Sequence, residues 1–354
     1  DWDEDALQEL FNELQDEDLS GLGWDEDELS GILDDMYSDE EQGAPKSLVE
    51  RFGAPPFSIF DGRQKYWLDR KRYWLSFGIQ SHLGRSNLDK HHTVSSGQLN
   101  QMGTFNISYE GGGSVFDPVL CEILCSWFCM PKGKILDPFA GGSVRAIIAS
   151  VLGFEYVGCE LREEQITANV EQIKNVGKSI QLLGDTRYVQ GDSNETLDKI
   201  KEKFDLVFSC PPYFNLEKYS GLDGDISNMN WDNFSKSYRS IIKKSCELLK
   251  ENSFAVFVVG EVRGKNGTYV NLINETTRAF IDAGMSYYNE IIYLTPFGTI
   301  VLTAANSLKS SRKIAKTHQN ILVFYKGDTK KVSEYWRDIE ITVLETEEDH
   351  GPKK

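Results

Sequence analysis

The sequence contains no run of about 18 uninterrupted apolar residues, the length that a membrane-crossing helix needs. Its first residues lack the basic and apolar regions of a secretory signal peptide. Six cysteines among 354 residues do not form the dense pattern of a disulfide-stapled protein. These absences predict a cytoplasmic location, and the length predicts one large α/β core with appendages.

Basic residues are missing from residues 1–43, which hold 10 Asp and 8 Glu and account for a charge of −18. The other 37 acidic and 38 basic residues give +1, so local basic stretches of a neutral body can still bind phosphates. We predict that residues 1–43 form an acidic linker or tail with short amphipathic helical patterns. The alternative is a DNA-mimicking autoinhibitory arm.

Typical metal-binding patterns are also absent. Three cysteines fall on one face of a predicted helix with no Cys-x-x-Cys or His partner nearby, and we interpret them as small core residues: Cys121, Cys125 and Cys129. Three histidines lie in the polar, Gly-rich stretch 81–113, which we interpret as a loop near the site rather than a zinc site: His82, His91 and His92. No metal is therefore expected.

A Pro-Pro pair ends one apolar run. Residues 204–209 predict a buried strand, and Cys210-Pro211-Pro212-Tyr213 follows it. Because proline has no N–H to give a sheet, the strand must end there with its carbonyl groups facing outward. The Tyr213 ring can then stack on a flat heterocycle while the Pro211 carbonyl and Cys210 accept from an exocyclic amine. The alternative is a strand-ending turn with a packed aromatic ring.

A second motif, Asp137-Pro138-Phe139-Ala140-Gly141-Gly142-Ser143, which we call the glycine loop, lies between a predicted buried strand and a predicted helix. Two adjacent glycines let a ligand approach the backbone, and the N-terminus of the helix offers free N–H groups. The motif lacks the Gly-Lys-Ser/Thr ending of a phosphate loop, and G-x-G-x-x-G is absent. It therefore predicts a site for an adenosyl ligand.

Acidic residues end the next two predicted strands: Glu160 follows residues 156–159, and Asp192 follows residues 188–190. The carboxyl ends of parallel strands lie along one edge of a sheet, where ligands bind. We therefore expect Asp137, Glu160, Asp192 and Cys210 to lie along the same edge.

With the glycine loop first and the Cys-Pro-Pro-Tyr corner second, residues 110–328 resemble the S-adenosylmethionine-dependent DNA methyltransferases that modify adenine N6 or cytosine N4. The resemblance implies a class I Rossmann-like α/β fold, with a seven-stranded, mostly parallel sheet and helices on both faces. It also implies methyl transfer from S-adenosylmethionine to the exocyclic amine of a flipped base.

The resemblance assigns roles to individual residues. The base pocket would be formed by Cys210, Pro211, Pro212 and Tyr213. The glycine loop would contact the methionine part of the cofactor, and Glu160 would bind its ribose. Asp192 and Ser193 would lie near its adenine. An upstream cofactor motif would be formed by Phe116, Asp117 and Pro118. The family usually has Asp, Asn or Ser in place of Cys210, and cysteine is a poorer acceptor, so more of the amine's alignment would fall on the Pro211 carbonyl.

Other activities stay open at this point. The same corner serves methylation of RNA or of a protein amide, and Cys210 leaves open a catalytically lapsed DNA-binding module. Attack of Cys210 on cytosine C6 is disfavoured because carbon methyltransferases place proline before the cysteine, whereas Ser209 stands there. Neither the target base, the recognition sequence, the strandedness of the substrate nor the oligomeric state follows from the sequence.

A narrower resemblance covers residues 214–219, 227–229, 258–263 and 316–324, which are similar to methylases of phages and mobile elements. A restriction-modification role is a further expectation. These enzymes are often fused behind a ParB-like domain. Because the chain begins with Asp1, we expect it to be a piece of such a longer polypeptide.

Two basic stretches are candidates for DNA contact. Residues 63–75 interleave five bases with four aromatic residues, and we predict a helix that buries Trp67 and Trp74 and partly exposes Arg70, Lys71 and Arg72. The second stretch, between the last two predicted strands, is either a DNA contact or a solvated loop; its candidate residues are Lys309, Arg312 and Lys313. The expected domains are residues 1–43, an extension over 44–113, a catalytic domain over 114–328 and a tail over 329–354.

Overall fold

The computed structural model describes residues 47–80, 116–214, 216, 219–264, 266–297, 300–337, 339 and 341. The chain divides into two compact units, residues 1–50 and residues 51–354. In the described part of the first unit, the Ser47 backbone N–H donates to the Glu50 carboxylate at 2.7 Å, at the start of α3 (Leu48–Phe52). The acidic segment 1–43, the predicted loop 81–113 with its histidines, and residues 342–354 lie outside the described residues.

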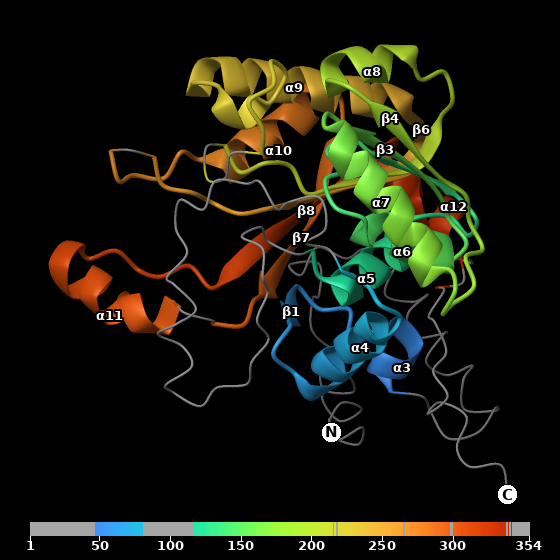
Figure 1. The fold of residues 1–354 in the computed structure, drawn as a ribbon, viewed down its shortest axis with the longest axis horizontal. Coiled ribbons are helices and arrows are strands. Elements are labelled where there is room, and N and C mark those ends of the chain that lie inside the picture. Colours follow the sequence, from blue (N-terminus) through green and yellow to red (C-terminus); the bar gives the residue numbers. More distant parts are fainter. Residues whose placement is uncertain are drawn as a thin grey trace, which may run out of the picture. The chain divides into compact units, whose positions relative to one another are not determined.

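The second unit is built on an eight-stranded sheet with the order β1-β7-β8-β6-β5-β2-β3-β4 (Figure 1). Its strands are β1 (Ile59–Asp61), β2 (Lys134–Asp137), β3 (Glu155–Glu160), β4 (Thr186–Gln190), β5 (Phe204–Ser209), β6 (Leu249–Val259), β7 (Ser286–Leu294) and β8 (His318–Lys326). All neighbours are parallel except β8, which runs antiparallel to both β6 and β7. This mostly parallel sheet with a final antiparallel pair confirms the predicted Rossmann-like α/β fold.

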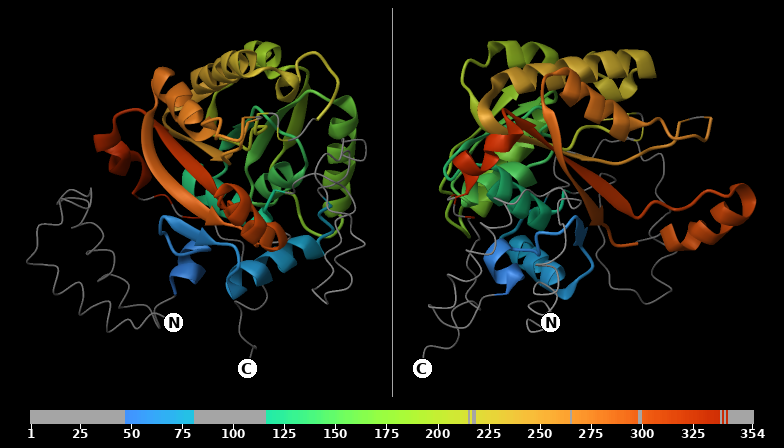
Figure 2. Two further views of the ribbon diagram at one scale, coloured as in Figure 1. Left: turned by 90° about the vertical axis from the view of Figure 1, so that its left-hand side faces the viewer. Right: turned by 180° about the vertical axis from the view of Figure 1, so that it is seen from behind.

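Helices cover both faces of the sheet (Figures 1 and 2). The described helices after α3 are α4 (Lys65–Ser76), α5 (Pro118–Phe128), α6 (Val144–Val151), α7 (Glu163–Val176), α8 (Ser193–Lys199), α9 (Trp231–Leu248), α10 (Leu272–Asp282), α11 (Ile300–Ser311), α12 (Val332–Trp336) and the 3-10 turns η3 (Ile226–Asn228) and η4 (Thr329–Lys331). Within the described ranges, no helix combines the length and the apolar character that crossing a membrane requires.

Alternate residues of the central strands belong to two separate apolar clusters. Leu206 of β5 and Val256 of β6 pack with residues of α4, α5, α6 and α7, whereas Val207 and Phe257 pack with residues of α8, α9 and α10. Because both faces of these strands are buried, their sequences are continuous apolar runs, as parallel sheets require. The same clusters contain the cysteines of α5 and the Cys129 that follows it, which confirms their interpretation as core residues.

The structure differs from the sequence-based expectation in two places. The sheet has an eighth strand, β1, which pairs with β7 and buries Phe60. Its three residues are too few to show an alternating pattern, so the sequence did not predict it. The basic stretch between β7 and β8, interpreted as either a DNA contact or a solvated loop with no helix predicted, contains the helix α11.

Candidate active site

A cavity of about 450 Å³ opens at the carboxyl edge of the parallel strands. The residues of the predicted motifs that line it are Phe116, Asp117, Pro138, Phe139, Gly141, Gly142, Glu160, Asp192, Ser193, Cys210, Pro211, Pro212 and Tyr213. Four other predicted cofactor contacts do not line it: Pro118, Asp137, Ala140 and Ser143. The structure thus brings the glycine loop and the Pro-Pro corner to one cavity.

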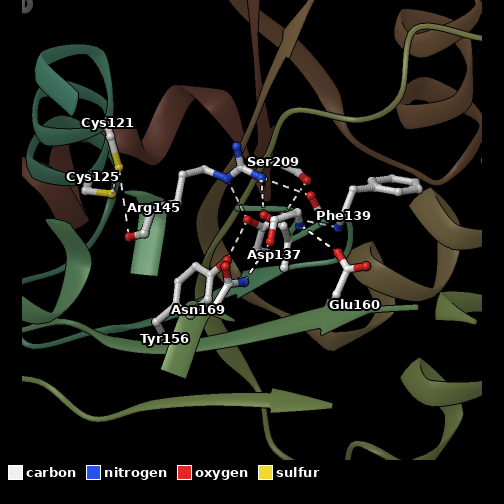
Figure 3. Close-up of polar contacts among 11 residues, drawn as sticks. Cys121, Cys125, Asp137, Phe139, Arg145, Tyr156, Glu160, Asn169 and Ser209 are labelled. Atoms are coloured by element: carbon white, nitrogen blue, oxygen red, sulfur yellow. Dashed lines mark hydrogen bonds and ion pairs between the residues drawn. The ribbon is translucent and has the colours of Figure 1, made fainter. Parts of the chain in front are cut away.

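Asp137 does not line the cavity and has no exposed surface. Figure 3 shows its polar contacts. Its Oδ1 accepts from the Ser209 hydroxyl at 2.5 Å and from the backbone N–H of Phe139 at 3.1 Å. Its Oδ2 accepts from Arg145 Nε at 2.6 Å and from the Tyr156 hydroxyl at 2.7 Å. A carboxylate with four donors has little capacity left, so the expected direct contact of Asp137 with the cofactor is replaced by a role in holding the loop.

Arg145 is the buried partner of Asp137. Burial by itself lowers the pKa of an arginine, but the charge of Asp137 raises the pKa of Arg145 above its usual value, so the guanidinium is charged. The guanidinium also donates through Nη2 to the carbonyls of Phe139 and Ala140, both at 2.9 Å. Its Cζ lies 4.8 Å from the centroid of the Phe116 ring. The guanidinium therefore fixes the backbone path of the glycine loop.

Glu160 holds the same loop from the end of β3. Its Oε2 accepts from the Gly141 N–H at 3.0 Å, and its Oε1 accepts from the Arg162 N–H at 2.9 Å. On the other side, Asn169 of α7 donates to the Gly141 carbonyl at 2.7 Å (Figure 3). Gly141 has φ +54°, a left-handed conformation that glycine adopts without steric cost.

Asp192 lies at the next strand end, where it caps α8 by accepting from the Asn194 N–H at 2.8 Å. Gly224, with φ +120°, approaches it so closely that an added β-carbon would lie 3.2 Å from the Asp192 β-carbon. Residues 219, 220 and 224–226 line the cavity beside Asp192, and Asp225 ties this segment together by accepting from both Ser220 and Ser227. No motif in the sequence predicted that these residues would form a wall of the cavity.

The Cys-Pro-Pro-Tyr corner forms another part of the cavity. The Tyr213 ring packs on the backbone of Gly260, where an added β-carbon would lie 2.8 Å from the ring. The Tyr213 hydroxyl lies 3.3 Å from the Val258 carbonyl and 3.5 Å from Cys210 Sγ. Gln319 of β8 donates to the same hydroxyl through Nε2 at 3.0 Å. Burial raises the pKa of Tyr213, so the phenol stays protonated.

The basic helix α4 packs on α5 through two carboxylates. Asp117, which caps α5, accepts from Trp67 Nε1 at 3.2 Å and from Lys71 Nζ at 2.8 Å. One turn further along each helix, Glu122 accepts from Arg70 Nε at 2.9 Å and from Trp74 Nε1 at 2.6 Å.

Both tryptophans of α4 are fully buried, as predicted. Arg70 and Lys71, expected to contact DNA, point to α5 in this structure, whereas the Arg72 side chain is 71% exposed and pairs with Asp69.

The helix α11 extends away from the ends of β7 and β8 (Figure 1), and in the sequence it follows the cavity-lining residues Thr295 and Pro296. Residues 295–317 contain four basic residues and no acidic one. Lys309 and Arg312 are exposed, Lys313 is half-buried, and none of the three forms an ion pair with a described residue.

Several residues that shape the site carried no recognisable signal in the sequence. Arg145, Tyr156 and Ser209 hold Asp137, and Gln319 holds Tyr213. Ser209 directly precedes the Pro-Pro corner and Arg145 closely follows the glycine loop, so their positions could have drawn attention. Gln319 lies 106 positions from Tyr213 and could not have been paired with it.

The residues present fit S-adenosylmethionine. A volume of about 450 Å³ lies within the range of about 300–1,000 Å³ found for small-molecule sites. The glycine backbone at Gly141 and Gly142 admits a close ligand, and the carboxylates of Glu160 and Asp192 are acceptors suited to hydroxyl and amino groups.

Residues 204–351 match the family N6_N4_Mtase, described as DNA methylase. The chain is similar to TrmN from Thermus thermophilus, with 14% identity, a TM-score of 0.41, and coverage of 60% of this chain and 49% of that one. It thus spans about half the length of TrmN. A methyltransferase from Pyrococcus furiosus matches with 17% identity, a TM-score of 0.40, and coverage of 65% and 93%. No curated protein matches the chain.

Proposed function

We propose that this chain, whose residues 204–351 match the N6-adenine and N4-cytosine DNA methylases, transfers a methyl group from S-adenosylmethionine to an exocyclic amine of DNA. The observation that carries the proposal is that the glycine loop after β2 and the Pro-Pro corner after β5 line one cavity. The chemistry needs both an adenosyl site and a corner with outward carbonyls within reach of each other.

Each residue has a part in this proposal. When bound, S-adenosylmethionine supplies an electrophilic methyl group on its sulfonium. The glycine loop and Glu160 would hold the cofactor, and Asp192 would lie near its adenine. The Pro211 carbonyl would accept from the amine of a flipped base, which draws the nitrogen lone pair out of conjugation with the ring. The Tyr213 ring would stack on that base.

The proposed DNA contact is α11. Lys309 in its last turn and Arg312 and Lys313 just after it follow the cavity-lining residues Thr295 and Pro296 along the chain, and the absence of acidic residues from 295–317 suits a phosphate backbone. Arg72 is a further candidate, whereas Arg70 and Lys71 would have to leave the carboxylates of α5 to reach DNA.

The proposal extends to the organisation of the chain. Residues 114–328 would form the catalytic domain, completed by residues 51–80, whose strand β1 extends its sheet. Residues 1–43 and 329–354 would flank it. An upstream ParB-like domain in the same polypeptide is a part of the proposal that rests on the resemblance alone. A cytoplasmic location is also part of the proposal and follows the expectation from the sequence composition.

The test is transfer of tritium from labelled S-adenosylmethionine to DNA, RNA and protein in parallel, followed by nucleoside analysis of the labelled product. We expect label on DNA as N6-methyladenine or N4-methylcytosine. Tyr213→Ala should lower turnover strongly while cofactor affinity, measured by calorimetry, stays the same, since stacking is worth about 1–3 kcal/mol per base. Label on cytosine C5, on RNA alone or on protein would contradict the proposal, and no label on any substrate would indicate a binding module.

A further inference from the structure

The Tyr213 hydroxyl is a junction of three polar contacts inside the cavity. It lies 3.3 Å from the Val258 carbonyl, 3.5 Å from the Cys210 thiol and 3.0 Å from the Gln319 amide nitrogen. Cys210, Tyr213 and Gln319 all line the cavity. The thiol and the amide therefore lie on the same side of the site, one hydroxyl apart.

The chemistry of these groups determines where each proton points. A backbone carbonyl can only accept, so the Tyr213 proton is donated to Val258. The Tyr213 oxygen must then accept from its other two neighbours, which means that the Gln319 NH2 and the Cys210 S–H both donate to it. This direction leaves the Gln319 amide oxygen as an acceptor without a donor among the described residues, on a side chain that lines the cavity.

An exocyclic amine has two N–H groups, and the proposed site offers one acceptor, the Pro211 carbonyl, at the corner. Cys210 occupies the position where a second acceptor is expected, but sulfur accepts weakly and its proton is directed to Tyr213. Of the carboxylates that line the cavity, Asp117 and Asp225 accept from N–H groups of the protein, and Glu160 and Asp192 are assigned to the cofactor in the proposed function.

We infer that the amide oxygen of Gln319 accepts from the second N–H of the target amine, and that Gln319 thereby replaces the acceptor that Cys210 does not provide. Gln319 would then be a catalytic residue of the reaction. Tyr213 holds the amide in the orientation that presents its oxygen to the cavity. This inference rests on the proposed function, because it concerns the same amine.

The test compares methyl transfer to DNA by four variants with that of the wild type. Gln319→Met keeps the length of the side chain and removes both polar atoms, so kcat should fall at least about tenfold, by analogy with the loss of one positioned hydrogen-bonding group. Affinity for S-adenosylmethionine, measured by calorimetry, should not change. Tyr213→Phe removes only the hydroxyl that orients Gln319 and should cost less.

Rescue separates substrate contact from mere support of Tyr213. In the Gln319→Met background, Cys210→Asn restores an amide oxygen at the corner and should recover most of kcat. Gln319→Glu should remain active at neutral pH and acquire a new acidic limb in its pH–kcat profile, because its carboxylate accepts well only when ionised.

Three results would overturn the inference alone: an active wild type with an unchanged Gln319→Met variant, equal losses in Gln319→Met and Tyr213→Phe, or no rescue by Cys210→Asn. A wild type that labels no amine of any nucleic acid would overturn the proposed function, and this inference with it.

Discussion

The carboxylate of Asp137 at the end of β2 joins two neighbouring strands and the glycine loop. Tyr156 reaches it from β3, Ser209 from β5, and Arg145 from α6. Because these donors lie on different elements, one residue aligns the strand that precedes the Pro-Pro corner with the loop that faces the proposed cofactor. The cavity therefore depends on a residue that it does not expose.

Asp137→Ala should destabilise the whole domain rather than only weaken cofactor binding. The substitution leaves the buried guanidinium of Arg145 without its carboxylate, and breaking a buried ion pair in this way costs about 3–5 kcal/mol. Urea unfolding in the absence of cofactor measures the difference. The matched control is Asp198→Asn, which removes a carboxylate that is 63% exposed and pairs with Lys244. That change should cost no more than about 1 kcal/mol. Similar losses for both variants would contradict the role given to Asp137.

The residues of the site were predictable from the sequence only where the signal is local. The glycine loop and the Pro-Pro corner are short motifs, and their meeting follows from the parallel sheet. The direction in which Asp137 points was not predictable, because it depends on Ser209, 72 positions away. Gln319 was missed for the same reason: it comes from a strand inserted antiparallel between β6 and β7.

The basic and aromatic residues of α4 pack this helix against α5. Its buried face presents a base and a tryptophan four positions apart to each of two carboxylates on α5. Trp67 and Lys71 form one pair and Arg70 and Trp74 the other, so the two pairs lie about one helical turn apart on the same face of α4. The pattern of residues 63–75 is therefore explained largely by helix packing. The sequence predicted the burial of the two tryptophans but not the ion pairs with α5.

The helix α11 has the opposite character: in the described residues it buries none of its own side chains. Replacing Lys309, Arg312 and Lys313 together with Gln should weaken DNA binding and flatten its dependence on salt. Each lost phosphate contact lowers the slope of log K against log salt by about 0.9. Fluorescence anisotropy with a labelled duplex at several salt concentrations measures both quantities.

The control for the α11 variant is a second triple substitution, of Lys178, Lys199 and Lys201 with Gln. Lys178 follows α7, Lys199 ends α8 and Lys201 follows α8, and all three are exposed. The next element after each is a strand, so these lysines lie at the amino edge of the sheet, away from the cavity. The control should keep the salt slope of the wild type. If it lost as much slope as the α11 variant, binding would depend on total charge, and α11 would not be the contact.

At the scale of the whole molecule, charge is distributed very unevenly. Residues 1–43 carry a charge of −18 and the rest of the chain carries +1, which gives the net charge of −17. A segment of this charge repels DNA over distances limited by screening, which is about 8 Å at physiological ionic strength. If repulsion is its only effect, it acts on association with DNA and leaves the chemical step unchanged.

Removing residues 1–43 should therefore tighten DNA binding several-fold at low salt, and the gain should disappear as salt approaches 1 M, where the screening length falls to about 3 Å. Turnover at saturating DNA should stay the same, because the residues proposed to bind the cofactor and the base line a cavity formed by residues 71–319. Anisotropy and tritium transfer on the truncated and full chains measure these quantities. The sign is fixed by the charge: a net −17 becomes +1. A gain in affinity that persists at high salt, or competition by the isolated segment against DNA, would contradict simple repulsion. It would show instead that the segment occupies the DNA site as a mimic, the alternative left open by its composition.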